Sequence, residues 1–229
     1  MGIVPEQANA YLYFTVWQNL ALMAELHGTP RDKYTIMGND LIDLFRLTEK
    51  KRVKAGNLSK GQRQRLMICM AMISEPDMLF LDEPTTGLDV TSSRLIREII
   101  RHENQTRGTT VFLTTHNMQE AEELCGRVAI INNGKIKAVN TPEALSRRID
   151  ALRSVEVRFN GRGVDENELC AIETVQFVKT NGKGVRIFTP HPGLVAQQIA
   201  CLAQQKGVVL EAINTCEPAL EDVFLHLTQ

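Results

Sequence analysis

The chain has 229 residues, a formal net charge of −1, 43% apolar residues and 23% charged residues, which is the composition of an ordinary globular protein. A net charge near zero gives no bulk electrostatic attraction to nucleic acid. Five dispersed cysteines without a Cys-x-x-Cys pair are typical of reduced thiols, not of a disulfide framework or zinc site. The longest apolar run, Leu66 to Ile73, is far shorter than the ~20 residues of a membrane span. An N-terminus with Glu6 but no early Lys or Arg does not predict a signal peptide.

The spacing of apolar residues predicts that helices and strands alternate over roughly the first two thirds of the chain. Residues 1–15 are expected to be irregular or extended. Helices are expected at 15–26, 30–47, 59–74, 91–105, 117–124 and 142–149. Strands are expected at 78–81, 109–114, 128–131 and 135–139. The last two strands flank Asn133-Gly134, a strong hairpin signal. The alternation predicts an α/β fold with a largely parallel sheet core.

The composition changes near residue 150, and the predicted elements change with it. Strands are expected at 155–159, 175–179, 185–188 and 208–213, with helices near 166–171, 193–205 and 218–227. The order is βαββαβ with a trailing helix, which predicts a small ferredoxin-like α+β domain. We therefore expect two domains, residues 1–148 and 149–229.

Residues 58–66 read Leu-Ser-Lys-Gly-Gln-Arg-Gln-Arg-Leu, and Ser59 opens a predicted helix. Ser59 and Gln62 fit a capping box, which is a common structural feature. The same geometry suits a phosphate, because a helix N-terminus with a hydroxyl and unshielded amides, including that of Gly61, is an anion site. In the purely structural interpretation, Arg63 and Arg65 form a solvated helix face.

Asp82 and Glu83 follow the predicted strand Met-Leu-Phe-Leu and precede Pro84. In a structural interpretation they are only the polar end of a strand entering a turn. Two adjacent carboxylates also suit metal-assisted hydrolysis. Asp82 would hold Mg²⁺ through water, because this ion keeps much of its hydration. Glu83 would orient or deprotonate a water for in-line attack on a γ-phosphate.

In this order the two motifs resemble the signature motif and the Walker B strand of the ATP-binding cassette (ABC) ATPases. Residues 85–89, Thr-Thr-Gly-Leu-Asp, are similar to the family's D-loop, and residues 113–122 around His116 to its switch region. The resemblance implies a partial P-loop NTPase domain with a helical subdomain, and ATP and Mg²⁺ as cofactors. It implies a head-to-tail dimer in which His116 senses the γ-phosphate and in which ATP is contacted across the dimer by Leu58, Ser59, Gly61, Gln62 and Asp89.

Residues 3–7 followed by 12–16 resemble the family's Q-loop, which contacts Mg²⁺ and the membrane subunit. The position of its glutamine falls on Glu6, so Glu6 is the implied metal contact, and a multi-span permease is expected to dock near residues 6–20. The aromatic residues Tyr11, Tyr13, Phe14 and Trp17 can be interpreted equally well as part of the core or as an exposed docking patch.

Residues 217–225 resemble the ending of exporter-type cassette ATPases, although by its own periodicity this stretch is only an amphipathic helix. The resemblance implies an ATPase that powers export through a separate permease, and that lies in the cytoplasm on the inner face of the cell membrane.

No Gly-x-x-x-x-Gly-Lys-Ser/Thr phosphate loop occurs in the chain, so by itself it is expected to bind ATP poorly and hydrolyse little. The simplest expectation is a fragment or late-start reading of a longer protein. One alternative is a short, non-catalytic module that donates Ser59 and Glu83 to a partner's nucleotide. Another is a soluble cassette ATPase of translation or DNA repair, against which the lack of a basic surplus argues.

Overall fold

The computed structural model describes residues 1–7, 10–147, 153–160, 163–181, 184–216 and 218–228. The chain divides into two compact units, Met1–Leu124 (unit 1) and Cys125–Gln229 (unit 2). The domain boundary that the sequence predicts after residue 148 falls at residues 148–152, outside the described residues, and it stays a prediction. Among the described residues no helix combines the length and the apolarity of a membrane-crossing segment.

Unit 1 is built on a parallel sheet whose described strands are β1 (Gly2–Val4), β2 (Met78–Asp82) and β3 (Thr110–Thr114), in the order β1-β2-β3. The register pairs Val4 with Leu81, and Asp82 with Thr114, so the three strands end at the same edge. Strand β1 lies in the stretch expected to be irregular or extended, because three residues are too few to show a period. The parallel sheet that the sequence predicts is confirmed.

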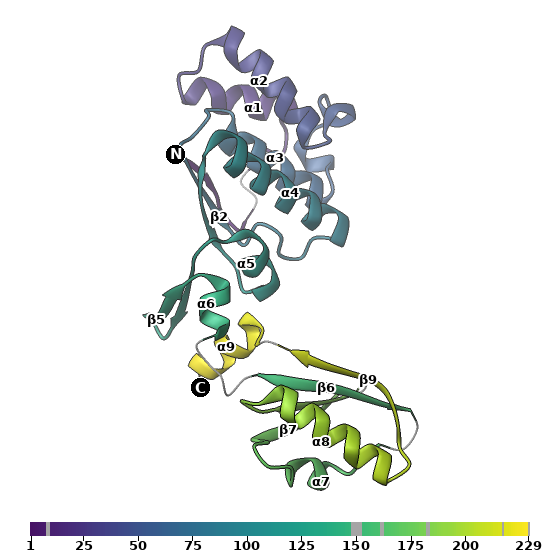
Figure 1. Ribbon diagram of the computed structural model, residues 1–229. Coiled ribbons are helices and arrows are strands. Elements are labelled where there is room, and N and C mark those ends of the chain that lie inside the picture. The colour runs from purple at the N-terminus through teal and green to yellow at the C-terminus, as the bar shows by residue number, and fades with distance from the viewer. Residues whose placement is uncertain (8–9, 148–152, 161–162, 182–183, 217, 229) are drawn as a thin grey trace. The chain divides into compact units, whose positions relative to one another are not determined.

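One helix of unit 1 packs against several others and against the sheet. Helix α3 (Lys60–Met72) contacts α1 (Val16–Leu26), α2 (Arg31–Leu44), α4 (Val90–Arg107) and β1, and Figure 1 shows it among them. Its apolar run 66–72 is buried on every side, which is why this run shows no amphipathic pattern. Two short 3-10 turns, Thr48–Lys50 and Ala55–Asn57, lead from α2 into α3, and α5 (Met118–Leu124) follows β3.

The sheet of unit 1 has one packed face and one exposed face. Val4, Leu79 and Leu81 belong to the buried core that α3 and α4 complete. On the other face Ile3 is 58% exposed and Phe112 is 57% exposed. Parallel sheets are normally covered on both faces, so this face carries more open apolar surface than is usual for a complete α/β domain.

A buried asparagine organises the loop before α1. Asn19 is fully buried, and its Oδ1 accepts a hydrogen bond from Tyr11 N at 2.8 Å. Its amide group donates to the backbone oxygens of Tyr11 at 3.1 Å and Thr15 at 2.9 Å. The loop backbone is thereby satisfied from inside, and the side chains of residues 11–14 are exposed, Tyr13 by 87%.

The aromatic residues 11–17 therefore divide between the two interpretations. Tyr11, Tyr13 and Phe14 lie on the surface, as a docking patch requires, and the first and last of them stack at 5.6 Å. Trp17 is partly buried, contacts the ring of Tyr34 and packs over Gly38. The term aromatic loop is used below for residues 11–14.

Unit 2 begins with a hairpin of β4 (Val128–Asn132) and β5 (Lys135–Asn140), as predicted, and continues into α6 (Pro142–Arg147). Its antiparallel sheet has the order β7-β8-β6-β9 and consists of β6 (Ser154–Asn160), β7 (Phe177–Asn181), β8 (Gly184–Phe188) and β9 (Val209–Cys216). With α7 (Glu166–Cys170) and α8 (Pro192–Gln205) between the strands, this order fits the predicted ferredoxin-like arrangement.

The two faces of this sheet have different partners. Val155, Val157 and Ile187 share a buried cluster with Val195 and Ile199 of α8. Arg186 alternates with Ile187 and so lies on the opposite face, where its guanidinium pairs with Asp222 of α9 (Leu220–Thr228) at 2.9 Å. The trailing helix is thus tied to the sheet by an ion pair.

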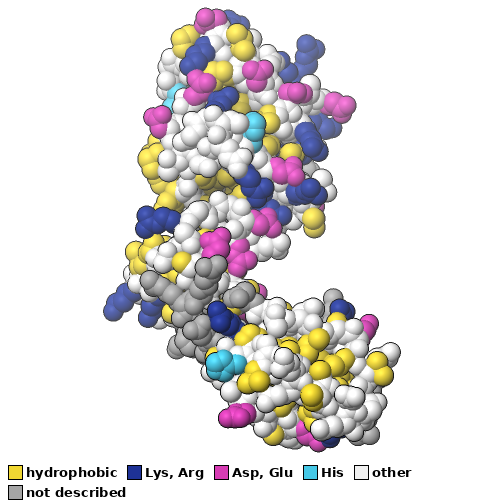
Figure 2. All heavy atoms as spheres, in the orientation of Figure 1, with side chains coloured by type: hydrophobic (Ala, Val, Ile, Leu, Met, Phe, Trp, Pro, Cys, Tyr) yellow, Lys and Arg dark blue, Asp and Glu magenta, His cyan; other side chains and the backbone are white. Residues whose placement is uncertain are grey.

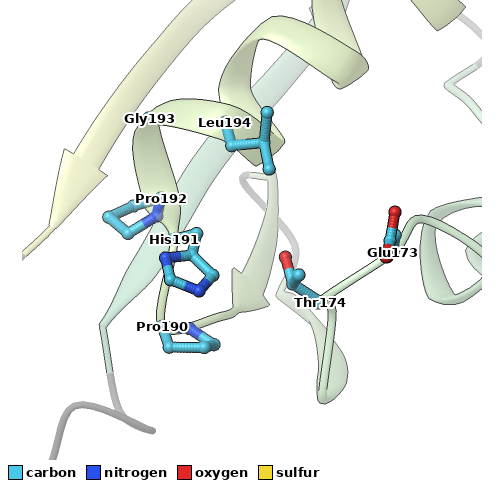
Figure 3. Close-up of a pocket in the computed structure, with 7 residues that line it drawn as sticks. All are labelled: Glu173, Thr174, Pro190, His191, Pro192, Gly193 and Leu194. Atoms are coloured by element: carbon cyan, nitrogen blue, oxygen red, sulfur yellow. The ribbon is translucent and has the colours of Figure 1, made fainter.

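The surface of unit 2 carries a shallow pocket of about 570 Å³. The pocket is lined by Glu173, Thr174 and residues 190–194 at the start of α8 (Figure 3). None of the candidate site residues from the sequence analysis lines this pocket.

Unit 1 carries charge of both signs. Figure 2 shows Lys and Arg mixed with Asp and Glu over the visible face of unit 1. This mixture is what a net charge of −1 leads one to expect.

Replacing Asn19 by Ala should destabilise unit 1 by about 1–3 kcal/mol, because it empties a fully buried site and leaves the N–H of Tyr11 without its partner. The measurement is urea-induced unfolding followed by circular dichroism. Asn57→Ala is the matched control: this asparagine is exposed, and its loss should change the unfolding free energy by less than about 0.5 kcal/mol. Equal effects of the two substitutions would contradict the role given to Asn19.

Candidate functional site

The carboxyl edge of the parallel sheet collects the acidic and imidazole side chains that the sequence singled out. Asp82 ends β2, Glu83 follows it, His116 comes two residues after β3, and Glu6 two residues after β1. Because parallel strands end together at this edge, the side chains meet there. The hydroxyl of Thr114 donates to the carboxylate of Asp82, and His116 Nδ1 lies 2.8 Å from Glu83 Oε1.

Glu83 has an unusual backbone conformation, and each of its carboxylate oxygens has a hydrogen-bond partner. Its φ is +48°, which is uncommon for a residue other than glycine and is found most often at functional sites. Its N–H donates to Thr114 O at 3.1 Å, which holds the bend. One carboxylate oxygen pairs with His116, and the other accepts the hydroxyl of Thr86 at 2.6 Å. The side chain is 18% exposed, so it is positioned by these contacts and still reaches solvent.

The pKa of His116 is raised above its usual value. The hydrogen bond that the ring donates to Glu83 is the largest cause and the charge of Glu83 the next, with smaller contributions from Glu120 and Glu6. The contribution of Glu6 supports its place at this edge. The predicted contact of His116 with a γ-phosphate stays a prediction, since the ring contacts Glu83 in this structure.

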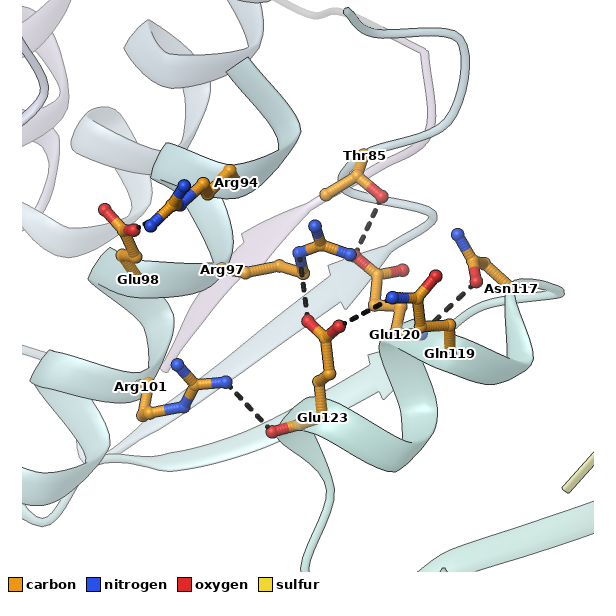
Figure 4. A network of polar contacts seen from close by, with 9 residues as sticks. All are labelled: Thr85, Arg94, Arg97, Glu98, Arg101, Asn117, Gln119, Glu120 and Glu123. Carbon is orange, nitrogen blue, oxygen red and sulfur yellow. Dashed lines mark hydrogen bonds and ion pairs between the residues drawn. The ribbon is translucent and has the colours of Figure 1, made fainter. Parts of the chain in front are cut away.

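Polar contacts hold α5 against α4 and so fix the segment that carries His116 (Figure 4). Arg97 forms an ion pair with the carboxylate of Glu123 at 3.5 Å, which also accepts from Gln119 at 2.9 Å, and the backbone oxygen of Glu123 accepts from Arg101 at 3.1 Å. The two arginines come from one face of α4, four residues apart, and both reach the same glutamate.

A buried acid joins the D-loop segment to α5. Glu120 is 1% exposed and accepts the hydroxyl of Thr85 at 2.8 Å. The N–H of Glu120 donates to Asn117 Oδ1 at 3.2 Å, so Asn117 caps the helix as the sequence predicts. Figure 4 shows Thr85 reaching down to Glu120 from the loop after β2. The loop after β2 and the segment after β3 are therefore one hydrogen-bonded unit.

The start of α3 has the predicted capping box and an exposed serine. Ser59 Oγ accepts from Gln62 N at 3.2 Å, and Gln62 Oε1 accepts from Ser59 N at 3.0 Å. Gly61 is buried against α4, where a Cβ would lie 2.5 Å from Ser92 Oγ, so only glycine fits. Leu58 is 5% exposed and belongs to the core, so its side chain anchors the helix start. Residues 58–62 are called the signature tip below.

Arg63 and Arg65 do not form the solvated helix face that the structural interpretation expected. The guanidinium of Arg63 donates to Ala55 O, Gly56 O and Leu58 O at 3.3–3.4 Å. Arg65 donates to Phe45 O at 2.8 Å, and partial burial lowers its pKa. Both arginines therefore satisfy backbone carbonyls. Their i, i+2 spacing already places them on different sides of the helix, which is a signal against one solvated face.

Asp89 brings the D-loop segment to the signature tip. It caps α4 by accepting from Ser92 N at 2.8 Å, and hydrogen bonds from Ser92 lower its pKa. Its Oδ2 would lie 3.5 Å from a Cβ on Gly61. Lys60 Nζ donates to Thr86 O at 3.0 Å, a contact that sequence reasoning did not find. The predicted site residues thus form two clusters, at the sheet edge and at the signature tip, and residues 84–89 run between them.

The residues present fit part of a Mg²⁺–nucleotide site. Asp82 is exposed, and Thr114 occupies one of its oxygens, leaving the other without a hydrogen-bond partner among the described residues. One free carboxylate oxygen suits Mg²⁺, which takes few protein ligands and completes its shell with water and phosphate. In the described part of the chain no group of three or more His, Cys, Asp or Glu could hold a metal ion. Any Mg²⁺ here therefore depends on the nucleotide for further ligands.

Comparison with known proteins finds one family model and curated relatives that are named as export ATP-binding proteins. A family model described as "AAA domain, putative AbiEii toxin, Type IV TA system" matches residues 26–122. The Nod factor export ATP-binding protein I of Rhizobium sp. (strain N33) is 35% identical over 100% of this chain and 72% of that protein. A fluoroquinolones export ATP-binding protein of Mycobacterium tuberculosis (strain CDC 1551 / Oshkosh) is 32% identical over 100% of this chain and 67% of its own length.

Solved structures agree on the fold. The ATP-binding subunit of an ABC transporter superposes with a TM-score of 0.57 at 30% identity, covering 65% of this chain and 61% of that one. A dimeric ATP-binding cassette in a post-hydrolysis state, bound to ADP and phosphate, gives a TM-score of 0.55 at 23% identity over 61% of this chain and 62% of that one. This second likeness bears on the fold alone. The chain spans about six tenths of these solved chains and about seven tenths of the curated relatives.

Replacing Glu83 by Gln should lower the pKa of His116 toward its usual value, because it removes both the charge and the strongest hydrogen-bond acceptor. The measurement is an NMR titration of the His116 ring. The raised pKa also fixes the sign of the linkage: the pair contributes stability at pH values below the ordinary pKa of the ring, and this contribution is lost as the pH rises through the raised pKa.

The matched control for this titration is Glu98→Gln, which removes an exposed glutamate paired with Arg94 on α4. The titration of His116 should not change in this variant. A His116 titration that is the same in wild type and in Glu83→Gln would rule out the contact drawn here.

Proposed function

Because this chain belongs to the ATP-binding cassette family of transporter ATPases, we propose that it is the ATP-hydrolysing subunit of an exporter and works with a separate membrane permease. The observation that carries the proposal is the sheet edge, where an exposed Asp82 lies beside Glu83, whose carboxylate His116 and Thr86 hold in place. The names of the relatives, which are export or resistance ATP-binding proteins, support export as the direction of transport.

The two carboxylates take different parts in hydrolysis. Asp82, with its free oxygen, would hold Mg²⁺ mostly through water; when bound, this ion neutralises charge on the phosphates. Glu83 would orient the attacking water and accept its proton. His116 and Thr86 each bind one oxygen of Glu83, and each oxygen keeps a second lone pair with which it can accept a hydrogen bond from the water.

The signature tip would act on a nucleotide held by a second copy of the chain. Its serine is exposed at the positive end of α3, the place where a helix attracts a phosphate. Among the hydrogen bonds of the described residues, none joins the tip directly to Asp82 or Glu83, so within one subunit the two clusters do not form a single phosphate site. A head-to-tail dimer would bring the tip of one copy to the sheet edge of the other.

The aromatic loop would receive the permease, and the structure offers a route from it to the signature tip. Leu12 O accepts from Gly56 N at 2.9 Å, and Phe14 O accepts from Ala55 N at 2.8 Å. Arg63 in turn binds the carbonyls of residues 55 and 56. A displacement of the aromatic loop by the permease would therefore also displace the turn at residues 55–57 that leads into α3. In this arrangement the protein works at the inner face of the membrane, next to its permease.

The Gly-x-x-x-x-Gly-Lys phosphate loop does not occur in these 229 residues, and much of the affinity for ATP comes from such a loop. The chain by itself is therefore expected to bind ATP weakly, and experiments on hydrolysis use a protein in which these residues are accompanied by such a loop, called the complete protein below.

In the complete protein, Glu83→Gln should lower the rate of ATP hydrolysis by at least about a hundredfold, since it removes the proton acceptor for the water. It should preserve ATP binding, so that an ATP-dependent dimer accumulates. The measurements are phosphate release and size-exclusion chromatography with light scattering, with and without ATP. The surface variant Glu98→Gln should hydrolyse ATP at the wild-type rate. A Glu83→Gln protein that still hydrolyses ATP, or that never dimerises with ATP, would refute the proposed function.

Tyr13→Ser in the complete protein should weaken co-purification with the permease about tenfold and leave ATP-dependent dimerisation unchanged, because Tyr13 is the most exposed side chain of the aromatic loop. Leu26→Ser, at an equally apolar position 67% exposed at the end of α1, is the control and should co-purify normally. The measurement is pull-down of the permease in detergent, followed by quantitative immunoblotting. Equal recovery of the permease with Tyr13→Ser and wild type would place the docking surface elsewhere.

A further inference from the structure

We propose that Lys60 is a positioning residue that couples the two ATP sites of the dimer, by joining the signature tip of its own subunit to the D-loop segment 84–89. The inference rests on the proposed function, because the two sites exist only in a head-to-tail dimer. It starts from a contact between segments 26 residues apart, in which Lys60 Nζ donates to Thr86 O at 3.0 Å.

The lysine ammonium lies directly over the turn of the D-loop segment. Gly87 follows Thr86 and has a φ of +68°, in the region that favours glycine. A Cβ at Gly87 would lie 2.4 Å from Lys60 Nζ, so a larger residue here would displace the ammonium from its present position. The left-handed turn and the lysine fit each other.

Helix stability does not explain a lysine at this position. Lys60 is the first residue of α3, and a cation in the first turn is opposed by the helix dipole. The first turn of α3 contains no acidic residue, and the part of the chain that the structure describes offers Lys60 no ion pair. Its compensating partner is the carbonyl of Thr86. The position is therefore electrostatically costly for the helix and useful for contact with an oxygen-rich group.

The contact completes a chain of hydrogen bonds from the signature tip to the sheet edge. Thr86 accepts from Lys60 through its backbone oxygen and donates its hydroxyl to Glu83 at 2.6 Å. Glu83 in turn pairs with His116 at 2.8 Å. One residue, Thr86, thus holds both the lysine of the signature tip and the proposed proton acceptor.

In the dimer these two ends serve different nucleotides. The signature tip contacts the nucleotide of the second copy, whereas Glu83 acts on the nucleotide of its own subunit. A phosphate that reaches Ser59 attracts the neighbouring ammonium and competes with Thr86 O for it. Release of the Thr86 carbonyl lets the D-loop segment move, and the carboxylate of Glu83, which the Thr86 hydroxyl holds, moves with it into line with the attacking water. Binding at one site thereby prepares hydrolysis at the other.

The two helix starts stay together without the lysine. Gly61 packs against Ser92 at the start of α4, where even a methyl group would not fit. Removal of the ammonium should therefore leave the fold intact and loosen only the D-loop segment. This separates a positioning role for Lys60 from a merely structural one.

The test compares Lys60→Met, Lys60→Arg and the control Lys137→Met in the complete protein; Lys137 is exposed on β5 in unit 2. Without nucleotide, Lys60→Met should speed hydrogen exchange of a peptide covering residues 86–89 by about tenfold, as local opening becomes easier. The Hill coefficient for ATP hydrolysis should fall from above one toward one. Lys60→Arg should restore both, and Lys137→Met should match wild type.

Unchanged hydrogen exchange and an unchanged Hill coefficient in Lys60→Met would overturn the inference. A wild-type Hill coefficient of one in an active enzyme would do the same, as would equal losses in the Arg and Met variants. If the wild-type complete protein hydrolyses no ATP, the proposed function fails. The exchange measurement then still decides whether Lys60 restrains the D-loop segment.

Discussion

The register of the parallel sheet determines where every reactive group of unit 1 lies. Val4 pairs with Leu81, and Asp82 with Thr114, so the three strands end level with one another and their following residues emerge side by side. The hydroxyl of Thr114 then reaches the carboxylate of Asp82, and the backbone of the same threonine bends Glu83 into its left-handed conformation. A slip of one residue between β2 and β3 would turn these side chains to the other face and separate both contacts.

Helix α3 holds the signature tip at the proposed dimer interface as part of one rigid core. Its apolar run is buried on all sides, which leaves no freedom for the helix to tilt without opening the core. Its first turn reaches the surface with Ser59 exposed, while Arg63 and Arg65 satisfy carbonyls of the preceding segments that would otherwise lose their partners. The turn before α3 and the aromatic loop are linked by backbone hydrogen bonds. A permease on that loop and a phosphate at the tip would therefore act on the same element.

Much of this could be predicted from local sequence, and the rest depends on contacts between distant segments. The capping box at Ser59, the strand before Asp82 and the Asn133-Gly134 hairpin each follow from a few neighbouring residues, and the structure has all three. Strand β1 was missed because its three residues carry no period, although its pairing with β2 is regular. The Lys60–Thr86 contact depends on a left-handed turn at Gly87 and on two helix starts in contact, and neither can be seen in a window of ten residues. The division of the aromatic residues, with Tyr13 outside and Trp17 inside, is decided by the buried Asn19.

The contacts of Glu83 make its position depend on the D-loop segment. One carboxylate oxygen pairs with His116, and the other accepts the hydroxyl of Thr86. Each oxygen keeps a lone pair for a water, so these bonds orient the carboxylate without blocking it. The raised pKa of His116 means that the ion pair persists to higher pH than an isolated histidine would allow. A group that changes the orientation of Glu83 must therefore reach Thr86 or His116. In a subunit whose D-loop segment touches its own signature tip, the arrival of a second copy supplies that group.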